Sequence, residues 1–118
     1  MKLITEAQYT ELLANGFAAL AAARADCAFD PIPVVKLFTR NGYARWLLTD
    51  LDPFNTDRVY GLCDLGDGRP DLGYVNLRTI EGPQGKYRLY VEPDLHFVAD
   101  KPLSVYADIA YTRGLIVT

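Results

Sequence analysis

The chain has 118 residues, of which 50% are apolar and 23% are charged, and these values are typical of one globular domain. Acidic residues outnumber basic residues 15 to 12, which leaves a formal net charge of -3. A DNA-binding domain needs a basic surface, so this balance argues against direct DNA binding. We therefore expect residues 1–118 to fold as a single domain.

Membrane, metal and cofactor sites are not indicated by the residues. No stretch has the roughly 18 apolar residues of a membrane-spanning helix, and Glu6 stands where a signal peptide would carry its apolar run. We expect a cytoplasmic protein with no membrane contact, in which Cys27 and Cys63 are free thiols. Because neither cysteine belongs to a C-x-x-C pair and His96 is the single histidine, the sequence predicts no cysteine or two-histidine metal site and no cofactor.

The first predicted element is a helix that begins after Thr5, since Thr5 and Gln8 have the spacing of a capping box. Apolar residues then recur at helical spacing and predict one buried stripe. This stripe consists of Tyr9, Leu12, Leu13, Phe17 and Leu20. We expect a break or kink at Asn15-Gly16, because glycine favours helix ends. Asp30-Pro31-Ile32-Pro33 then forms a stiff connector, because two prolines cannot continue a helix.

The clearest local pattern is a hairpin. Residues 34–39 and 44–51 read as strands on either side of Arg40-Asn41-Gly42-Tyr43, and Asn-Gly is the favoured centre of a type I′ turn. This turn fixes the register of the strands. The expected pairs on the core face are Leu37 with Trp46 and Val35 with Leu48. On the other face Arg45 would lie opposite Phe38, in position for a cation–π contact.

Further strands are predicted at 58–65, 72–78 and 86–92, and residues 95–98 could extend the last of these. A second helix is expected to start at Pro102 and to end at Gly114. Its predicted buried side consists of Leu103, Tyr106, Ala107 and Ala110. The apolar residues 115–117 are expected to dock as an edge strand. This order predicts an α+β fold, mainly an antiparallel sheet of about five strands, with an N-terminal and a C-terminal helix packed on one face or at one end.

Negative charge is concentrated in residues 50–71, which we call the acidic segment. It holds two arginines and six aspartates, a net charge of -4, whereas the remaining residues carry +1. The aspartates are Asp50, Asp52, Asp57, Asp64, Asp67 and Asp71. They could simply serve turns, where aspartate is common. They could also hold a hard cation, act as an acid and base pair, or present a negative surface to a basic partner.

An ordered series of short motifs runs along the chain. They are VVKLF at 34–38, WLLTDLDP at 46–53, GLCDLG at 61–66, PDLGYV at 70–75, DLHF at 94–97 and KPLSVYA at 101–107. Over nearly its full length the chain resembles a small bacterial family known only as a domain of unknown function. The resemblance implies a gene carried by plasmids and integrative elements, often beside antirestriction genes. The resemblance also implies a short helix after the strand that contains Tyr74 and Val75, whereas residues 77–83 look too short and too rich in glycine and proline for a full helix here.

Three hypotheses follow. The first is a non-enzymatic accessory protein of a mobile genetic element. It would bind a host or defence complex of the antirestriction or anti-CRISPR type, through the six aspartates of the acidic segment. Its partner would be a protein with a basic surface, such as a nucleic-acid-binding complex, and His96, Arg45 and Phe38 are secondary candidates for the contact.

The second hypothesis is a small metal-dependent or hydrolytic enzyme. It would use Asp50, Asp52, Asp64 and His96. A nucleophilic role for Cys63 is disfavoured, because this residue lies in an apolar strand and carries no nucleophile motif. The third hypothesis is a structural or regulatory domain that associates with itself through an exposed apolar face.

Overall fold

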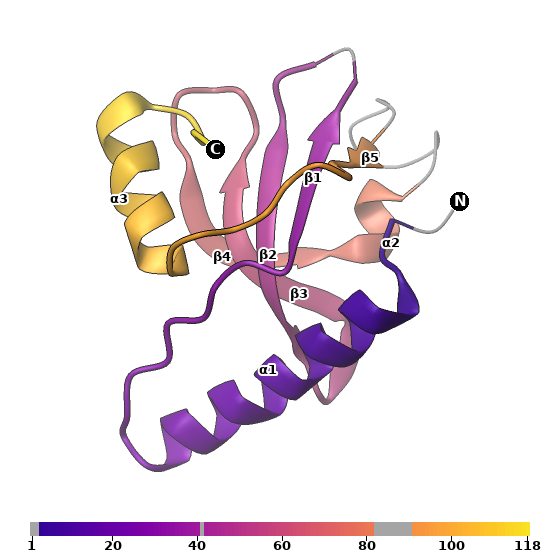
Figure 1. The fold of residues 1–118 in the computed structure, drawn as a ribbon, viewed down its shortest axis with the longest axis vertical. Coiled ribbons are helices and arrows are strands. Elements are labelled where there is room, and N and C mark those ends of the chain that lie inside the picture. Colours follow the sequence, from indigo (N-terminus) through magenta and orange to yellow (C-terminus); the bar gives the residue numbers. More distant parts are fainter. Residues whose placement is uncertain (1–2, 41, 82–90) are drawn as a thin grey trace.

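An antiparallel sheet organises residues 3–40, 42–81 and 91–118, which are the residues that the computed structural model describes. Within them the strands follow the order β4-β3-β2-β1-β5, with helices packed against the sheet (Figure 1). The elements are α1 (Glu6–Arg24), β1 (Val35–Thr39), β2 (Arg45–Asp52), β3 (Asn55–Asp64), β4 (Asp71–Asn76), α2 (Leu77–Ile80), β5 (Val91–Pro93) and α3 (Leu103–Arg113). The predicted α+β class, with its antiparallel sheet and terminal helices, is confirmed.

The β1–β2 hairpin has the predicted register. Leu37 lies opposite Trp46, and Val35 lies opposite Leu48. All four side chains are buried and belong to one core cluster. The predicted turn residue Asn41 lies outside the described residues, but the pairing on both strands is the one that a two-residue turn requires.

The helices pack on opposite faces of the sheet. One core cluster joins Leu12 of α1 and Ile80 of α2 to Trp46 of β2. A second cluster joins Leu47, the next residue of β2, to Leu103 of α3. Because neighbouring strand residues point to opposite faces, α1 and α2 cover one side, the α1 face, and α3 covers the other, the α3 face. The expectation that both terminal helices share one face or end is wrong, because β2 is apolar on both sides and needs cover on both.

Helix α1 runs unbroken from Glu6 to Arg24, so the expected break or kink at Asn15-Gly16 is wrong. A Cβ atom on Gly16 would lie 1.8 Å from the carbonyl oxygen of Leu51, so only glycine lets the helix approach β2 this closely. Beside it, Asn15 Nδ2 donates a hydrogen bond to the carbonyl of Thr49 over 2.9 Å. The Asn-Gly pair therefore fastens the helix to the sheet instead of ending it.

The start of α1 is as predicted, with a complete capping box between Thr5 and Gln8. The predicted buried stripe is only partly correct. Leu12 is fully buried, whereas Tyr9 is 40% and Phe17 is 57% exposed. The helix touches the sheet along the line set by its glycine, so these two aromatic residues flank the contact instead of filling it.

The segment after β4 differs from its prediction. The strand ends at Asn76 instead of continuing to residue 78, because the Asn76 side chain accepts the Arg78 N–H (2.9 Å) and starts a helix. The described part of the segment 77–83 forms the single helical turn α2, whose Leu77 and Ile80 are buried.

Most of the predicted strand 86–92 lies outside the described residues. The last strand that the structure describes, β5, begins at Val91. The suggested extension through residues 95–98 is wrong. The chain leaves the sheet after Pro93 and turns. The Asp94 carboxylate accepts the His96 N–H (3.0 Å) at this point and stabilises the turn.

Helix α3 is close to its prediction. Its buried residues are Leu103, Tyr106, Ala107 and Ala110, and Gly114 ends it in the left-handed conformation with φ 77°. The tail 115–117 docks, but it forms no strand. Ile116 is buried, and its N–H donates to the Asp64 carboxylate over 3.0 Å. A side-chain oxygen thus accepts this N–H in place of the main-chain carbonyl of a neighbouring strand. No helix among the described residues is long and apolar enough to cross a membrane.

The contact at Gly16 can be tested with Gly16→Ala. The new methyl group would meet a backbone oxygen that cannot move aside, so we expect a loss of about 1–3 kcal/mol of unfolding free energy. Gly73→Ala is the matched control, because a Cβ atom at Gly73 meets nothing within 4 Å. Urea unfolding of the two variants measures the difference. Equal stability of Gly16→Ala and Gly73→Ala would contradict the close helix–sheet contact.

Candidate functional site

The aspartates of the acidic segment serve different local purposes. Asp67 accepts the N–H of the residue two places further on (3.0 Å), and Asp71 accepts that of the next residue (2.9 Å). These are ordinary turn contacts of aspartate. Asp57 forms an ion pair with Arg78 at 3.3 Å. These three aspartates are at least partly exposed, and each has its own local partner.

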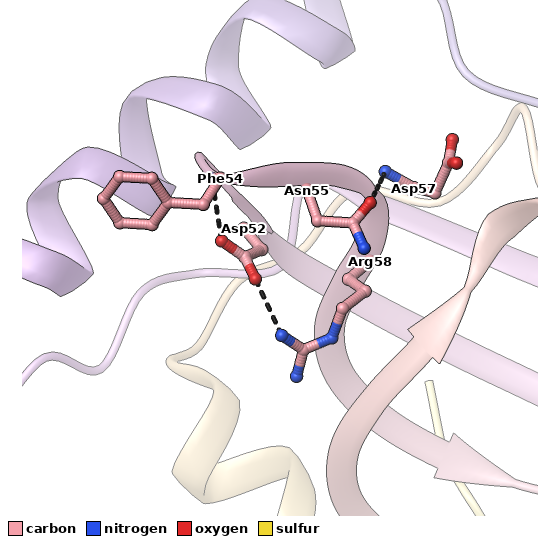
Figure 2. A network of polar contacts seen from close by, with 5 residues as sticks. All are labelled: Asp52, Phe54, Asn55, Asp57 and Arg58. Atoms are coloured by element: carbon pink, nitrogen blue, oxygen red, sulfur yellow. Dashed lines mark hydrogen bonds and ion pairs between the residues drawn. The ribbon is translucent and has the colours of Figure 1, made fainter.

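The end of the β2–β3 hairpin is held by Asp52 (Figure 2). One of its oxygens accepts the Phe54 N–H (2.9 Å), and the other pairs with the Arg58 guanidinium (2.7 Å). Asn55 accepts the Asp57 N–H (3.2 Å) on the same turn. The Phe54 ring points away from the ion pair and is 78% exposed (Figure 2). Asp52 therefore shapes this turn and also fixes the position of Arg58.

Asp64 is a structural carboxylate. It is only 1% exposed, and its two oxygens accept the N–H groups of Gly66 (2.9 Å) and Ile116 (3.0 Å). It therefore ties the segment after α3 to the end of β3. It also lines a surface pocket of about 420 Å³ together with Arg45.

Asp50 reaches the α3 face because of a β-bulge. The pairing of β2 with β3 shifts between Leu48 and Asp50, so that Thr49 is an extra residue and Asp50 lies opposite Tyr60. Tyr60 packs against the α3-face core, whereas Leu51 returns to the α1-face core. In a regular strand Asp50 would point into the α1-face core, and the bulge turns it to the other side.

On the α3 face Asp50 lines a pocket of about 250 Å³ with Tyr60 and Tyr74, and we call it the Asp50 pocket. Its remaining walls come from α1, from the connector together with the preceding Phe29, from β2 and from α3. They are Ala19, Phe29, Pro31, Thr49 and Leu103. The two tyrosine rings meet edge to face, with centroids 5.1 Å apart. The Arg58 guanidinium lies 4.1 Å from the centroid of the Tyr74 ring.

The Asp50 carboxyl is strongly desolvated, with 5% of the residue exposed. Burial raises the pKa of Asp50, and a hydrogen bond from the Thr49 hydroxyl (2.5 Å) opposes this rise only in part. Burial also raises the pKa of Tyr60 and of Tyr74, and the negative charge of Asp50 adds to both shifts. Among the ion pairs of the described residues, none includes Asp50. A desolvated carboxyl in an aromatic pocket is a typical feature of a binding or catalytic site.

The connector holds one wall of this pocket in place. The Leu103 N–H donates to the Pro31 carbonyl (2.9 Å), and the Ser104 N–H and hydroxyl donate to the Asp30 carboxylate, the former over 2.9 Å. Pro102 stands at the N-cap of α3 and makes no side-chain cap hydrogen bond, so the connector supplies this cap. The wall is therefore attached to the start of α3.

The secondary candidates lie elsewhere. His96 is exposed and lines a surface pocket of about 390 Å³ with Phe38. Arg45 lies opposite Phe38 as predicted, and its guanidinium donates to the main-chain carbonyl two residues earlier (3.0 Å). Asp50, Asp64 and His96 thus line different pockets. Among the described residues, no group of three His, Cys, Asp or Glu side chains is placed to hold a metal ion.

A larger pocket, of about 560 Å³, lies between the start of α1 and α2. Its charged residues are Glu6, Asp57, Arg78 and Glu81, and all of them are at least partly exposed. Asp57 and Arg78 already neutralise each other. The Asp50 pocket is the stronger candidate, because it combines a buried carboxyl with aromatic walls.

Sequence reasoning missed the tyrosines of the Asp50 pocket. The alternation of β3 already places Tyr60 on the same face as Leu62, so this part of the pocket had a readable pattern. No residue pattern predicts the bulge at Thr49. None predicts that Phe29 and Pro31 lie beside the sheet and line this pocket.

Two asparagine substitutions should have opposite effects on stability. The pKa of Asp50 in the folded protein is raised above its unfolded value of about 3.9. The unfolding free energy is therefore higher at low pH, where this carboxyl is neutral, and it falls as pH rises through the folded pKa. Asp50→Asn should therefore raise the melting temperature at neutral pH. Asp64→Asn removes one of the two oxygens that accept the Gly66 and Ile116 N–H groups, and it should cost about 1–3 kcal/mol.

Thermal melts at neutral and at acidic pH measure both effects. The gain from Asp50→Asn should shrink on acidification, because the wild-type carboxyl becomes neutral. A lower melting temperature for Asp50→Asn at neutral pH would contradict the desolvation of this carboxyl.

The two free cysteines should differ in reactivity. Burial, with a smaller contribution from Asp71, raises the pKa of Cys63 to about 11, whereas Cys27 is exposed. Because the thiolate is the reactive form, iodoacetamide should modify Cys27 well before Cys63 in the folded protein at pH 8. Mass spectrometry of the labelled peptides measures the order, and labelling in urea should remove it. Equal rates in the folded protein would show that the Cys63 thiol is not buried as described.

Comparison with known proteins gives one family. No curated protein and no solved structure gives a significant match to the chain. The model of the family described as "Protein of unknown function (DUF2958)" matches residues 3–117. This confirms the expected resemblance to a family of unknown function, whereas the plasmid setting stays a prediction. Since the match covers nearly the whole chain, the protein belongs to the DUF2958 family.

Proposed function

We propose that the chain is a cytoplasmic, non-enzymatic binding protein that recognises a basic partner protein through Asp50 and Asp52 on the α3 face. The observation that carries this proposal is the Asp50 carboxyl, which is buried beside two tyrosines with no ion pair among the described residues. A buried charge without a cation destabilises a fold. A stability cost of this kind at a pocket is typical of residues kept for binding.

The proposal narrows the predicted acidic surface. Both oxygens of Asp64 and one oxygen of Asp67 accept backbone N–H groups, and Asp57 is paired with Arg78. Asp50 has only a hydroxyl partner, whereas Asp52 accepts the Phe54 N–H with one oxygen and pairs with Arg58 through the other. Among the six aspartates, as far as the described contacts show, Asp50 alone has neither a backbone N–H nor a cation as partner, and Asp52 lies on the same face.

The partner class follows from charge complementarity. A face with carboxylates and tyrosine rings attracts arginine and lysine side chains, both electrostatically and through cation–π contact. In the setting that the resemblance implies, a mobile genetic element, such a partner would be a host or defence complex with a basic nucleic-acid channel. The protein would then act as an antirestriction or anti-CRISPR factor.

This function is tested by binding to restriction and CRISPR effector complexes at several salt concentrations. The double substitution Asp50→Asn with Asp52→Asn should weaken binding at least about tenfold, because close interfacial charge pairs contribute more than 1.4 kcal/mol. It should also reduce the salt dependence of the affinity.

The matched control is Asp67→Asn, which also removes an aspartate charge of the acidic segment, at a turn outside the Asp50 pocket. It should bind as the wild type does. Binding that is equally affected by Asp67→Asn and by the double substitution would contradict the assignment to the α3 face.

A further inference from the structure

We infer that the Asp50 pocket seats the guanidinium group of one arginine side chain of the partner, with Asp50 as its counter-charge and Tyr60 and Tyr74 as its aromatic walls. This inference rests on the proposed function and names the group that the site recognises. Size supports a single side chain. The pocket has about 250 Å³, below the range of about 300–1,000 Å³ that is typical of small-molecule and cofactor sites.

The lining fits a long cationic side chain. The apolar stem of an arginine can lie against Phe29, Pro31 and Leu103, while its head reaches the carboxylate. The walls from α1, the connector and α3 carry no titratable group, so they do not compete for the cation. Besides Asp50, the titratable groups that line the pocket are Tyr60 of β3 and Tyr74 of β4. Asp71 and Tyr111 lie near Tyr60, and Asp52 and Arg58 lie near Tyr74.

The molecule already holds one guanidinium by the same pair of groups. Arg58 lies 4.1 Å from the Tyr74 ring centroid and pairs with the Asp52 carboxylate at 2.7 Å. Its side chain is 44% exposed, so this arrangement belongs to the open edge of the α3 face. Asp50 and Tyr60 repeat the combination of carboxyl and tyrosine deeper in the sheet, as directly opposed residues. The deeper pair has no guanidinium among the described residues.

Planar guanidinium is favoured over ammonium. It stacks on aromatic rings and is more weakly hydrated, so its transfer into a narrow pocket costs less. Binding also requires the ionised carboxyl. Affinity should therefore fall as pH falls through the pKa of Asp50, with the protonated form unable to supply the counter-charge.

The probe is N-acetylarginine amide, titrated into the intact protein and followed by ¹H–¹⁵N NMR. We expect roughly millimolar binding, as a single side chain allows. Shifts should centre on Thr49, Asp50 and Tyr60. The citrulline analogue has nearly the same shape without the charge and should produce no comparable shifts, and the lysine analogue should bind more weakly.

Asp50→Asn should reduce the affinity for the arginine probe at least tenfold, whereas Asp67→Asn should leave it unchanged. The amide spectrum of Asp50→Asn shows directly that the variant is folded, and Tyr74→Leu is a second variant that should weaken binding by removing a wall. Absence of shifts in the wild type, equal shifts with citrulline, or an unchanged affinity of Asp50→Asn would each overturn the inference.

An arginine-rich peptide separates this inference from the proposed function. If the peptide and a defence complex bind through Asp52 alone, the proposed function stands, but the inference that the Asp50 pocket seats an arginine is wrong. If the arginine probe binds at Asp50 but no basic protein partner does, the pocket stands and the proposed function fails.

Discussion

The close contact between α1 and the bulged part of β2 is the constraint on which the rest of the structure depends. Asn15 donates a hydrogen bond to the Thr49 carbonyl, and Gly16 lets the helix approach Leu51 to a distance that a side chain would prevent. The extra residue in β2 reverses the direction of the side chains that follow it. The same few residues therefore set the helix position, keep Leu51 in the α1-face core and turn Asp50 to the α3 face.

The elements that the sequence predicts correctly are those governed by short-range rules. The hairpin register follows from a two-residue turn, and the buried side and the end of α3 follow from helical spacing and Gly114. The errors concern long-range contacts. The Asn-Gly pair at 41–42 is the predicted centre of a hairpin turn, whereas Asn15-Gly16 fastens a helix to the sheet. Only the close approach of Leu51 distinguishes the second case. The face of Asp50 was equally unreadable, since one added residue inverts strand alternation.

The acidic segment shows why a count of charges is a poor guide to a charged surface. Its aspartates are close in sequence, but hairpin turns distribute them. Asp64 is buried under the tail, where it acts as a hydrogen-bond acceptor for the backbone. Asp50 instead keeps a carboxyl beside a pocket. Equal formal charges thus have opposite relations to stability, one supporting the fold and the other opposing it.

The position of α3 in the chain has a consequence for the order of folding. The α1 face draws on residues from Leu3 to Val91, whereas the α3 face needs Leu103 and Ile116, which follow all the described strands. Because chains emerge from the ribosome N-terminus first, the sheet and its α1 face can assemble while the opposite face is still open to water. During that interval the Asp50 pocket lacks Leu103, the wall that α3 supplies. The late element therefore covers the second face of the sheet and completes the Asp50 pocket in one step.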